Sequence, residues 1–261
     1  MLILEYHSVS DRRADTLSVS TAAFRRQMTH LVEQGYRVAP LEEAASHAAG
    51  APADEARPLA VITFDDGYRD NYENAYAVLR ALRLPATIFL TLDYVGTDRA
   101  FPWDEGLAAG VSRALTWKMV EEMAGEGLVQ FGSHTHSHPD LTRLEQDRAW
   151  EEIHGSRERL EERLGKSVSA FCYPHSRTAP WVNALVDRAG YTHACRTGAR
   201  GGDVFELPRT GIYRHTGWRE FQFKISPLGR QLAGRASLAG LRAAGAALLG
   251  RRRMAPAEGA S

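Results

Sequence analysis

Short apolar runs alternate with longer stretches of helical period along most of this chain, and this alternation limits the fold more than any other feature. The runs expected to form strands are residues 2–6, 59–64, 86–90, 129–132, 170–173 and 192–195. Helices are expected over residues 21–33, 72–82, 116–126, 144–164 and 180–189, with Thr21 as the first N-cap. Alternating βα units build a mainly parallel sheet or barrel. The sequence therefore predicts an α/β fold whose loops after the strands carry the chemistry.

The length and the charge of the chain limit its organisation and its partners. A chain of 261 residues suits one sizeable α/β domain and leaves little room for a second. The 32 basic and 32 acidic residues give a formal charge of zero, so the overall charge does not favour nucleic acid as a partner. We expect residues 1–227 to form the main folded domain and residues 228–261 to form a basic C-terminal helix and a disordered tail.

The cysteines and the N-terminus bear on the compartment. Cys172 and Cys195 each lie in a short apolar segment, where buried free thiols are expected rather than a disulfide or a nucleophile. The N-terminal sequence lacks the basic region and the long apolar stretch of a signal peptide. No run of about eighteen apolar residues occurs either. We therefore expect a cytoplasmic protein.

Basic residues without acidic partners mark the C-terminal part of the chain. Between Phe221 and Ala257 there are seven lysines and arginines and no acidic residue. Leucines recur at helical spacing from Leu228 to Leu249, although several glycines weaken a helix there. Such a tail can rest on an anionic membrane surface or on a partner. It can equally be a solvated helix that packs weakly on the domain, with disorder beyond Arg253.

Two adjacent carboxylates follow the apolar run at residues 59–64. Asp65 and Asp66 precede Gly67, where a buried strand would break into a tight turn. Adjacent side chains at such a point face different directions, so one carboxylate can bind a metal ion while the other faces a substrate. An Asp pair before Gly is equally common in ordinary turns. The pair therefore needs support from other residues.

Two histidines four residues apart supply that support. The spacing of His134 and His138 would put both imidazoles on one side of a helical turn, where they can bind one ion. His136, between them, should point elsewhere and is the weaker candidate for a ligand. With Asp66 the two histidines form a ligand set that leaves coordination positions for water and substrate. Zn²⁺ is the first expectation, and Co²⁺, Ni²⁺ and Mn²⁺ suit the same ligands.

Two motifs together resemble a known family. Thr-Phe-Asp-Asp-Gly-Tyr at residues 63–68 and Ser-His-Thr-x-x-His-Pro-x-Leu at residues 133–141 are similar to the first two motifs of the polysaccharide deacetylases, which include chitin, chitooligosaccharide and peptidoglycan deacetylases. The resemblance implies a distorted (β/α) barrel of about seven strands and metal-dependent removal of acetyl groups from N-acetylated sugars. Carried over by motif position, Asp65 is the general base, and the ion is held by Asp66, His134 and His138.

Residues 171–177 resemble the third motif of that family, in which Pro is followed by an aromatic residue and Gly. Tyr173 and Pro174 match the motif, whereas His175 and Ser176 depart from it. By position, the backbone N–H of His175 would face the oxyanion and Tyr173 would wall the pocket. Tyr-Pro is also an ordinary junction between a strand and a turn.

A general acid has to protonate the leaving amine, and two histidines are candidates. Some exopolysaccharide deacetylases of the family carry Tyr-His at the end of the first strand, which Tyr6 and His7 resemble. His7 is therefore the first choice, although it could be a structural histidine at a strand end. His215 is the alternative, in a polar segment without the family's C-terminal histidine motif. Arg209 resembles a position of the same subgroup and could pair with Asp65, contact substrate or lie at the surface.

Aromatic side chains could stack on sugar rings, although most of them are expected in the core. These are Tyr68, Tyr94, Trp103, Trp117, Trp181 and Trp218. The sequence favours a metal-dependent N-deacetylase, with residues 1–227 as its catalytic domain, acting on an N-acetylhexosamine unit of a polysaccharide, oligosaccharide or sugar conjugate. Its basic tail could dock it beside membrane-bound glycan assembly machinery. Two alternatives stay open: a hydrolase of another linear amide or of O-acetyl esters, and a glycan-binding relative without turnover.

Overall fold

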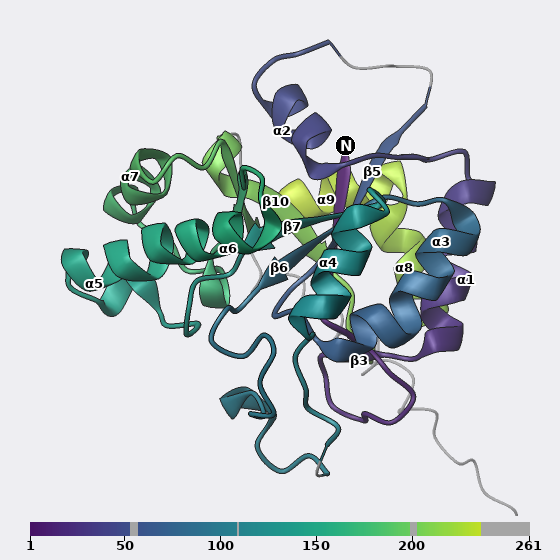
Figure 1. The fold of residues 1–261 in the computed structure, drawn as a ribbon. Coiled ribbons are helices and arrows are strands. Elements are labelled where there is room, and N and C mark those ends of the chain that lie inside the picture. The colour runs from purple at the N-terminus through teal and green to yellow at the C-terminus, as the bar shows by residue number, and fades with distance from the viewer. Residues whose placement is uncertain (53–56, 109, 199–202, 236–261) are drawn as a thin grey trace, which may run out of the picture.

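A closed ring of parallel strands forms the centre of the computed structural model, which describes residues 1–52, 57–108, 110–198 and 203–235 (Figure 1). Around the ring the order is β1 (Leu2–Tyr6), β10 (Leu207–Gly211), β9 (His193–Thr197), β8 (Ala170–Cys172), β7 (Val129–Ser133), β6 (Ala86–Leu90) and β5 (Leu59–Phe64). β5 pairs again with β1, with Leu2 opposite Ala60, and closes the ring. The short β4 (Arg37–Val38) pairs in parallel with the start of β5, and β2 (Ser8–Val9) pairs with β3 (Ser18–Val19). The expected distorted (β/α) barrel of about seven strands is confirmed.

Helices surround the strands on the outside of the ring (Figure 1). The α-helices are α1 (Thr21–Glu33), α2 (Leu41–Ala48), α3 (Tyr76–Leu82), α4 (Trp117–Gly125), α5 (Gln146–Trp150), α6 (Ser156–Leu164), α7 (Pro180–Arg188), α8 (Trp218–Ile225) and α9 (Pro227–Arg235). Two π-helical turns, η1 (Asn71–Ala75) and η4 (Glu151–Gly155), precede α3 and α6. Short 3₁₀ turns are η2 (Pro102–Asp104), η3 (Leu141–Arg143), η5 (Pro174–Ser176) and η6 (Val204–Glu206).

The strands carry two buried faces. Every residue of β5 is buried because helices cover one face and the barrel interior covers the other. Inward-facing side chains pack into an apolar layer that includes Ile3, Val61, Phe89, Cys195 and Leu207. Two residues further along a strand, the side chain faces the same side again. At these inward positions, β1, β5 and β10 carry polar side chains instead. The interior therefore changes from apolar to polar toward the carboxyl ends of the strands.

Some elements differ from the sequence-based expectation, and each difference has a local cause. Ser20, not Thr21, caps α1, because its side chain accepts a hydrogen bond from the backbone N–H of Ala23. The single helix expected over residues 144–164 is divided into α5, η4 and α6. β10, α2 and α8 were not anticipated. β10 contains Pro208 and Gly211, which are unfavourable in strands, and only pairing with β9 and β1 defines it.

The structure describes both cysteines and the first part of the expected C-terminal helix. Cys172 and Cys195 are both free and fully buried, which confirms the expectation for them. No helix in the described ranges has the length and apolarity needed to cross a membrane. The helix expected from Leu228 to Leu249 is described only as far as α9 reaches, and its remainder lies outside the described residues.

Candidate active site

A cavity of about 550 Å³ opens at the carboxyl ends of the barrel strands. This is the end of a parallel barrel where ligand sites usually occur. The side chains that line it come from at least six strands or strand ends: Glu5, His7, Leu17, Asp65, Asp66, Trp103, His134, His138, Tyr173, His175, Ser176, Arg196, Thr197 and Tyr213. Most of the residues singled out in the sequence therefore meet in one place.

Three side chains converge inside this cavity. The Nε2 atoms of His134 and His138 lie 3.2 Å apart, and each lies 3.7 Å from Oδ1 of Asp66. Within the described residues, these three form one of the groups close enough together to hold a single metal ion. The sequence motifs are seventy residues apart on the chain, and parallel pairing of β5, β6 and β7 brings their ends together.

Left-handed backbone conformations produce this convergence. Asp66 has φ 69°, and Gly67 after it has φ 73°. A Cβ atom on Gly67 would lie 2.5 Å from Cδ2 of Leu90, so only glycine lets this turn approach β6 so closely. The histidine segment is a loop with φ 69° at Thr135 and φ 65° at His138, not the helical turn that the spacing suggested. The two positive φ angles, rather than helical geometry, bring the imidazoles to one side.

The chemistry of the three side chains fits a divalent cation. Oδ1 of Asp66 is buried without a hydrogen-bond partner among the described residues, which is unfavourable for a carboxylate unless a cation lies beside it. Nδ1 of His134 lies 2.8 Å from the carbonyl oxygen of Cys172, so a proton on Nδ1 leaves the lone pair of Nε2 free toward Asp66. Burial raises the pKa of Asp66 to about 7 and lowers the pKa of His134 to about 4. Burial, with His134 and His175 nearby, also lowers the pKa of His138. The imidazoles are therefore neutral, as metal ligands must be.

Asp65 faces a different set of groups from its neighbour Asp66. The guanidinium of Arg209 donates to both of its carboxylate oxygens, Nη1 to Oδ1 and Nη2 to Oδ2, at 2.6 Å each. Burial alone would raise the pKa of Asp65, but the charge of Arg209 outweighs it and holds the pKa well below its ordinary value. Asp65 is therefore ionised at neutral pH. Of the places expected for Arg209, the structure shows the pairing with Asp65, since Arg209 is 2% exposed.

Glu5 is a functional-site residue that the sequence reasoning missed. Its carboxylate lies 3.2 Å from Arg209 and accepts hydrogen bonds from the hydroxyls of Thr197 and Tyr213. Arg209 thus bridges two buried carboxylates, Glu5 and Asp65. The signal was present in the sequence, because Glu5 is a charged residue inside an apolar strand expected to be buried on both faces.

The structure separates the two candidate general acids. Nε2 of His7 lies 3.9 Å from Oδ2 of Asp65, inside the cavity. The side-chain amide of Asn71 donates to the backbone oxygen of His7 at 2.7 Å and fixes the chain at that point. His215 is exposed, stacks on Tyr213 with ring centroids 5.7 Å apart and does not line the cavity.

The residues of the third motif form one wall of the cavity. Tyr173 is buried, and His175 has φ 56° within η5. The His175 ring lies 4.6 Å from the ring of His138. Pro174 is buried behind this wall and is not a lining residue. The departure from the family motif at His175 therefore places an imidazole beside the histidine pair.

Tyr68 was expected to contact substrate, and the structure corrects this expectation. This side chain is fully buried and does not line the cavity. Its hydroxyl accepts from Nε1 of Trp103 at 2.9 Å and donates to Asp104 at 3.2 Å, while Arg13 lies over its ring. Trp103 does line the cavity, with its ring 4.4 Å from that of His138. Tyr68 is therefore a support for Trp103, which is the stacking candidate that reaches the site.

The other aromatic candidates and His136 lie elsewhere. Tyr94, Trp117, Trp181 and Trp218 do not line the cavity. His136 points away from the histidine pair, as expected, with Nδ1 3.7 Å from Asp93.

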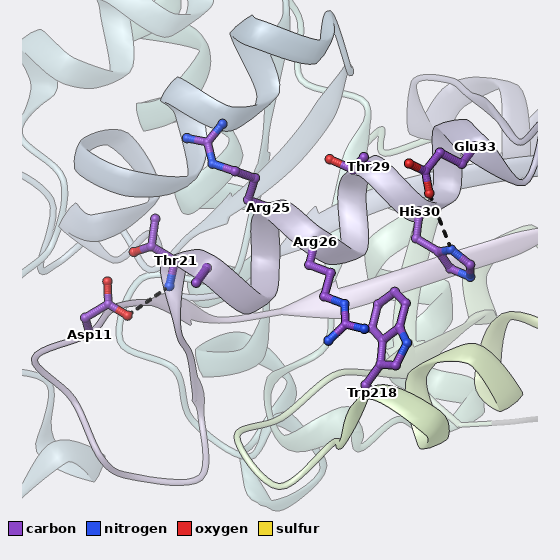
Figure 2. Close-up of a pocket in the computed structure, with 9 residues that line it drawn as sticks. Asp11, Thr21, Arg25, Arg26, Thr29, His30, Glu33 and Trp218 are labelled. Atoms are coloured by element: carbon purple, nitrogen blue, oxygen red, sulfur yellow. Dashed lines mark hydrogen bonds and ion pairs between the residues drawn. The ribbon is translucent and has the colours of Figure 1, made fainter.

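A larger hollow of about 810 Å³ lies between α1 and the start of α8 (Figure 2). Arg26 covers the Trp218 ring there, with its guanidinium carbon 3.8 Å from the ring centroid. Among the described residues, no group of potential metal ligands lies in this hollow. Its size therefore does not make it the better candidate for chemistry.

Comparison with known proteins decides the family. A sequence model of the polysaccharide deacetylases matches residues 53–194, more than half of the chain. The chain belongs to the polysaccharide deacetylase family. The resemblance drawn from the two motifs is thereby confirmed, and this deacetylase-family chain carries both motifs at the mouth of its barrel.

Two relatives with curated names are longer than this polysaccharide deacetylase chain. A Bacillus subtilis (strain 168) protein provisionally named polysaccharide deacetylase YxkH is 29% identical over 189 residues, covering 72% of this chain and 61% of that protein. The poly-beta-1,6-N-acetyl-D-glucosamine N-deacetylase of Escherichia coli (strain K12) is 36% identical over 139 residues, covering 51% of this chain and 20% of that protein. The chain therefore spans less than two thirds of either relative.

A solved structure agrees with the family assignment. A polysaccharide deacetylase from Bacillus cereus is 27% identical, has a TM-score of 0.70 and covers 86% of this chain and 68% of its own.

Proposed function

We propose that this protein is a metal-dependent hydrolase that removes N-acetyl groups from N-acetylhexosamine units of a polysaccharide, oligosaccharide or sugar conjugate. The observation that supports this most is the convergence of Asp66, His134 and His138 beside an ionised Asp65 in one cavity. One side of the site offers neutral and anionic ligands for a cation, and the other holds a carboxylate with a guanidinium behind it. A Lewis acid and a general base together can catalyse the hydrolysis of an amide.

In this proposal Asp66, His134 and His138 hold one divalent ion, with Zn²⁺ as the first candidate. A bound dication lowers the pKa of water and polarises a carbonyl. Asp65 accepts the proton of the attacking water, and Arg209 keeps its carboxylate ionised and fixed in orientation. The backbone N–H of His175 is the candidate donor to the oxyanion.

His7 is the proposed general acid, because it lies in the cavity and His215 does not. Its protonated imidazole would give a proton to the departing amine. His7→Ala is expected to lower kcat, whereas His215→Ala is expected to leave it unchanged. Measurement of kcat for both variants tests this assignment.

The substrate class draws on the relatives. The Escherichia coli relative is named for acting on poly-beta-1,6-N-acetyl-D-glucosamine, and Trp103 beside His138 offers a flat apolar face of the kind that sugar rings stack on. We therefore propose an N-acetylglucosamine-containing glycan as the substrate to test first.

An acetate-release assay distinguishes this function from its alternatives. Metal-stripped protein is expected to release no acetate from N-acetyl or O-acetyl sugars, and protein reconstituted with Zn²⁺ is expected to release it from N-acetylglucosamine oligomers. Preference for O-acetyl sugars would favour an esterase. Glycan binding without acetate release in metal-loaded protein would favour the relative without turnover.

We also propose that the C-terminal part contacts an anionic membrane surface. Three large apolar side chains of α8 and α9 are exposed: Phe223 by 44%, Leu228 by 58% and Leu232 by 40%. Lys224 and Arg230 lie on the same two helices, and the sequence beyond them is basic. Exposed apolar groups next to cations favour anionic lipid headgroups. The cytoplasmic location stays a prediction.

Co-sedimentation with phospholipid vesicles tests the membrane contact. The double variant Leu228→Ser/Leu232→Ser is expected to lose most binding to vesicles containing phosphatidylserine, while none of the proteins binds purely zwitterionic vesicles. Val32→Ser is the matched control, because Val32 is an exposed apolar residue of α1. Undiminished binding of the double variant would contradict the proposal.

A further inference from the structure

A buried carboxylate outside the active-site cavity holds the loop that carries His134 and His138. We propose that Glu152 is a positioning residue for this histidine loop, defined as residues 133–138, and that it sets the metal affinity of the site without being a ligand. The inference rests on the proposed metal-dependent function. It goes beyond it by assigning the metal affinity to a residue distant from the family motifs.

The contacts of Glu152 are all directed at the middle of the histidine loop. Its side chain is buried, at 5% exposure. Oε2 accepts hydrogen bonds from the backbone N–H groups of His136 and Ser137, both at 2.9 Å, and Oε1 accepts from the hydroxyl of Ser137 at 2.6 Å. Two consecutive backbone N–H groups form a concave anion site that one carboxylate fills. Glu152 therefore fixes the peptide units between the two ligand histidines.

The loop needs such support because its backbone is unfavourable. Thr135 and His138 both adopt left-handed φ angles although neither is glycine. Hydrogen bonds inside the loop, from the N–H of Thr135 to Ser133 and from the N–H of His138 to Thr135, help to stabilise it. They do not satisfy the N–H groups of His136 and Ser137. Only Glu152 accepts from those two groups in the described contacts.

A single turn of chain reaches two parts of the loop. Glu152 lies in the π-helical turn η4, and Ser156 begins α6 directly after it. The hydroxyl of Ser156 lies 2.7 Å from that of Ser133, at the start of the loop. π-Helical turns often occur at functional sites because they redirect side chains within a helix. Here the turn lets Glu152 face the middle of the loop while Ser156 faces its start.

Glu152 does not act as a ligand. Within the described residues, it belongs to none of the groups close enough to hold an ion together. Some residues orient metal ligands through hydrogen bonds without binding the metal. Their replacement typically changes metal affinity by about 10–100-fold. We expect an effect of this size from Glu152, transmitted through the backbone between His134 and His138.

The test measures Zn²⁺ affinity directly, by competition with a chromophoric chelator, in the full-length metal-stripped protein. Glu152→Gln is expected to raise the Kd for Zn²⁺ by about 10–100-fold, because a neutral amide oxygen accepts more weakly from the two backbone N–H groups than a carboxylate does and the amide nitrogen cannot accept from the Ser137 hydroxyl. Glu152→Asp keeps the charge but shortens the side chain, and it is expected to raise the Kd by less. Glu158→Gln is the matched control, since Glu158 is exposed on α6 and loses the same charge. Its Kd is expected to match that of the wild type.

The outcomes separate positioning from general stability. A lower Tm of metal-free Glu152→Gln together with an unchanged Kd would overturn the inference, since Glu152 would then be merely structural. If Glu152→Gln fails to fold, Ser137→Ala removes one of the three donors and is expected to raise the Kd several-fold; an unchanged Kd there would also overturn the inference. A wild type that binds no Zn²⁺ would instead overturn the proposed function.

Discussion

Replacement of Asp65 by Asn is expected to lower the rate of acetate release by about 10²–10⁴-fold, the usual contribution of a general base. The Zn²⁺ content should stay near that of the wild type, because Asp65 is paired with Arg209 rather than placed among the ligands. His138→Ala is expected to lose both activity and metal, since it removes one of three ligand atoms. Acetate assays and metal analysis of the same preparations measure the two quantities.

The contrast between the two variants is the informative result. Equal loss of metal in Asp65→Asn and His138→Ala would mean that Asp65 is itself a ligand. Full activity of Asp65→Asn with its metal retained would remove the general base from the proposal. His136→Ala serves as the control for histidine replacement, because its ring points away from the pair toward Asp93.

Replacement of Arg209 by Met is expected to destabilise the protein by about 3–5 kcal/mol. The change leaves two buried carboxylates, Glu5 and Asp65, without the cation that both of them contact. For a chain of this size, about 2–4 °C of Tm corresponds to each kcal/mol, so a fall of roughly 6–20 °C is expected in thermal unfolding. Arg209→Lys keeps the charge but cannot donate to both carboxylate oxygens in the same way. Its Tm should lie between those of the wild type and Arg209→Met.

Arg219 provides a control for the replacement of Arg209. Arg219→Met replaces an exposed arginine of α8 and is expected to leave the Tm within about 2 °C of the wild type, because surface substitutions change stability little. An Arg209→Met protein as stable as the wild type would show that the two carboxylates become protonated or hydrated at little cost. The bridge would then contribute to orientation but not to stability.

The barrel and its motif residues were predictable because each rests on a local pattern. The limits of β5 and β6 follow from apolar runs, and the metal ligand candidates follow the ends of β5 and β7. The pairing between Arg209 and Asp65 was one of several expectations, because β10 contains Pro208 and Gly211 and lacks a strand pattern. Glu5 was missed for a different reason: it was treated as part of an apolar run, although its inward position placed it with Asp65.

Other features could not be read from the sequence because they depend on backbone geometry or on distant contacts. The positive φ angles at Thr135 and His138 replace the expected helical turn. The role of Tyr68 beneath Trp103 depends on hydrogen bonds to residues 35 and 36 positions away. Likewise, the contact of Glu152 with the histidine loop exists only because a π-helical turn redirects that side chain.

The apolar layer beneath Glu5 and Arg209 has a kinetic consequence. Its side chains, among them Ile3, Val61 and Phe89, are almost fully buried and pack against one another inside the barrel. Under the proposed function, water, substrate and both products would therefore pass through the opening at the carboxyl ends of the strands. A long glycan lying across that opening would hold back the released acetic acid until the glycan moves. Product release would then limit turnover more than bond cleavage does.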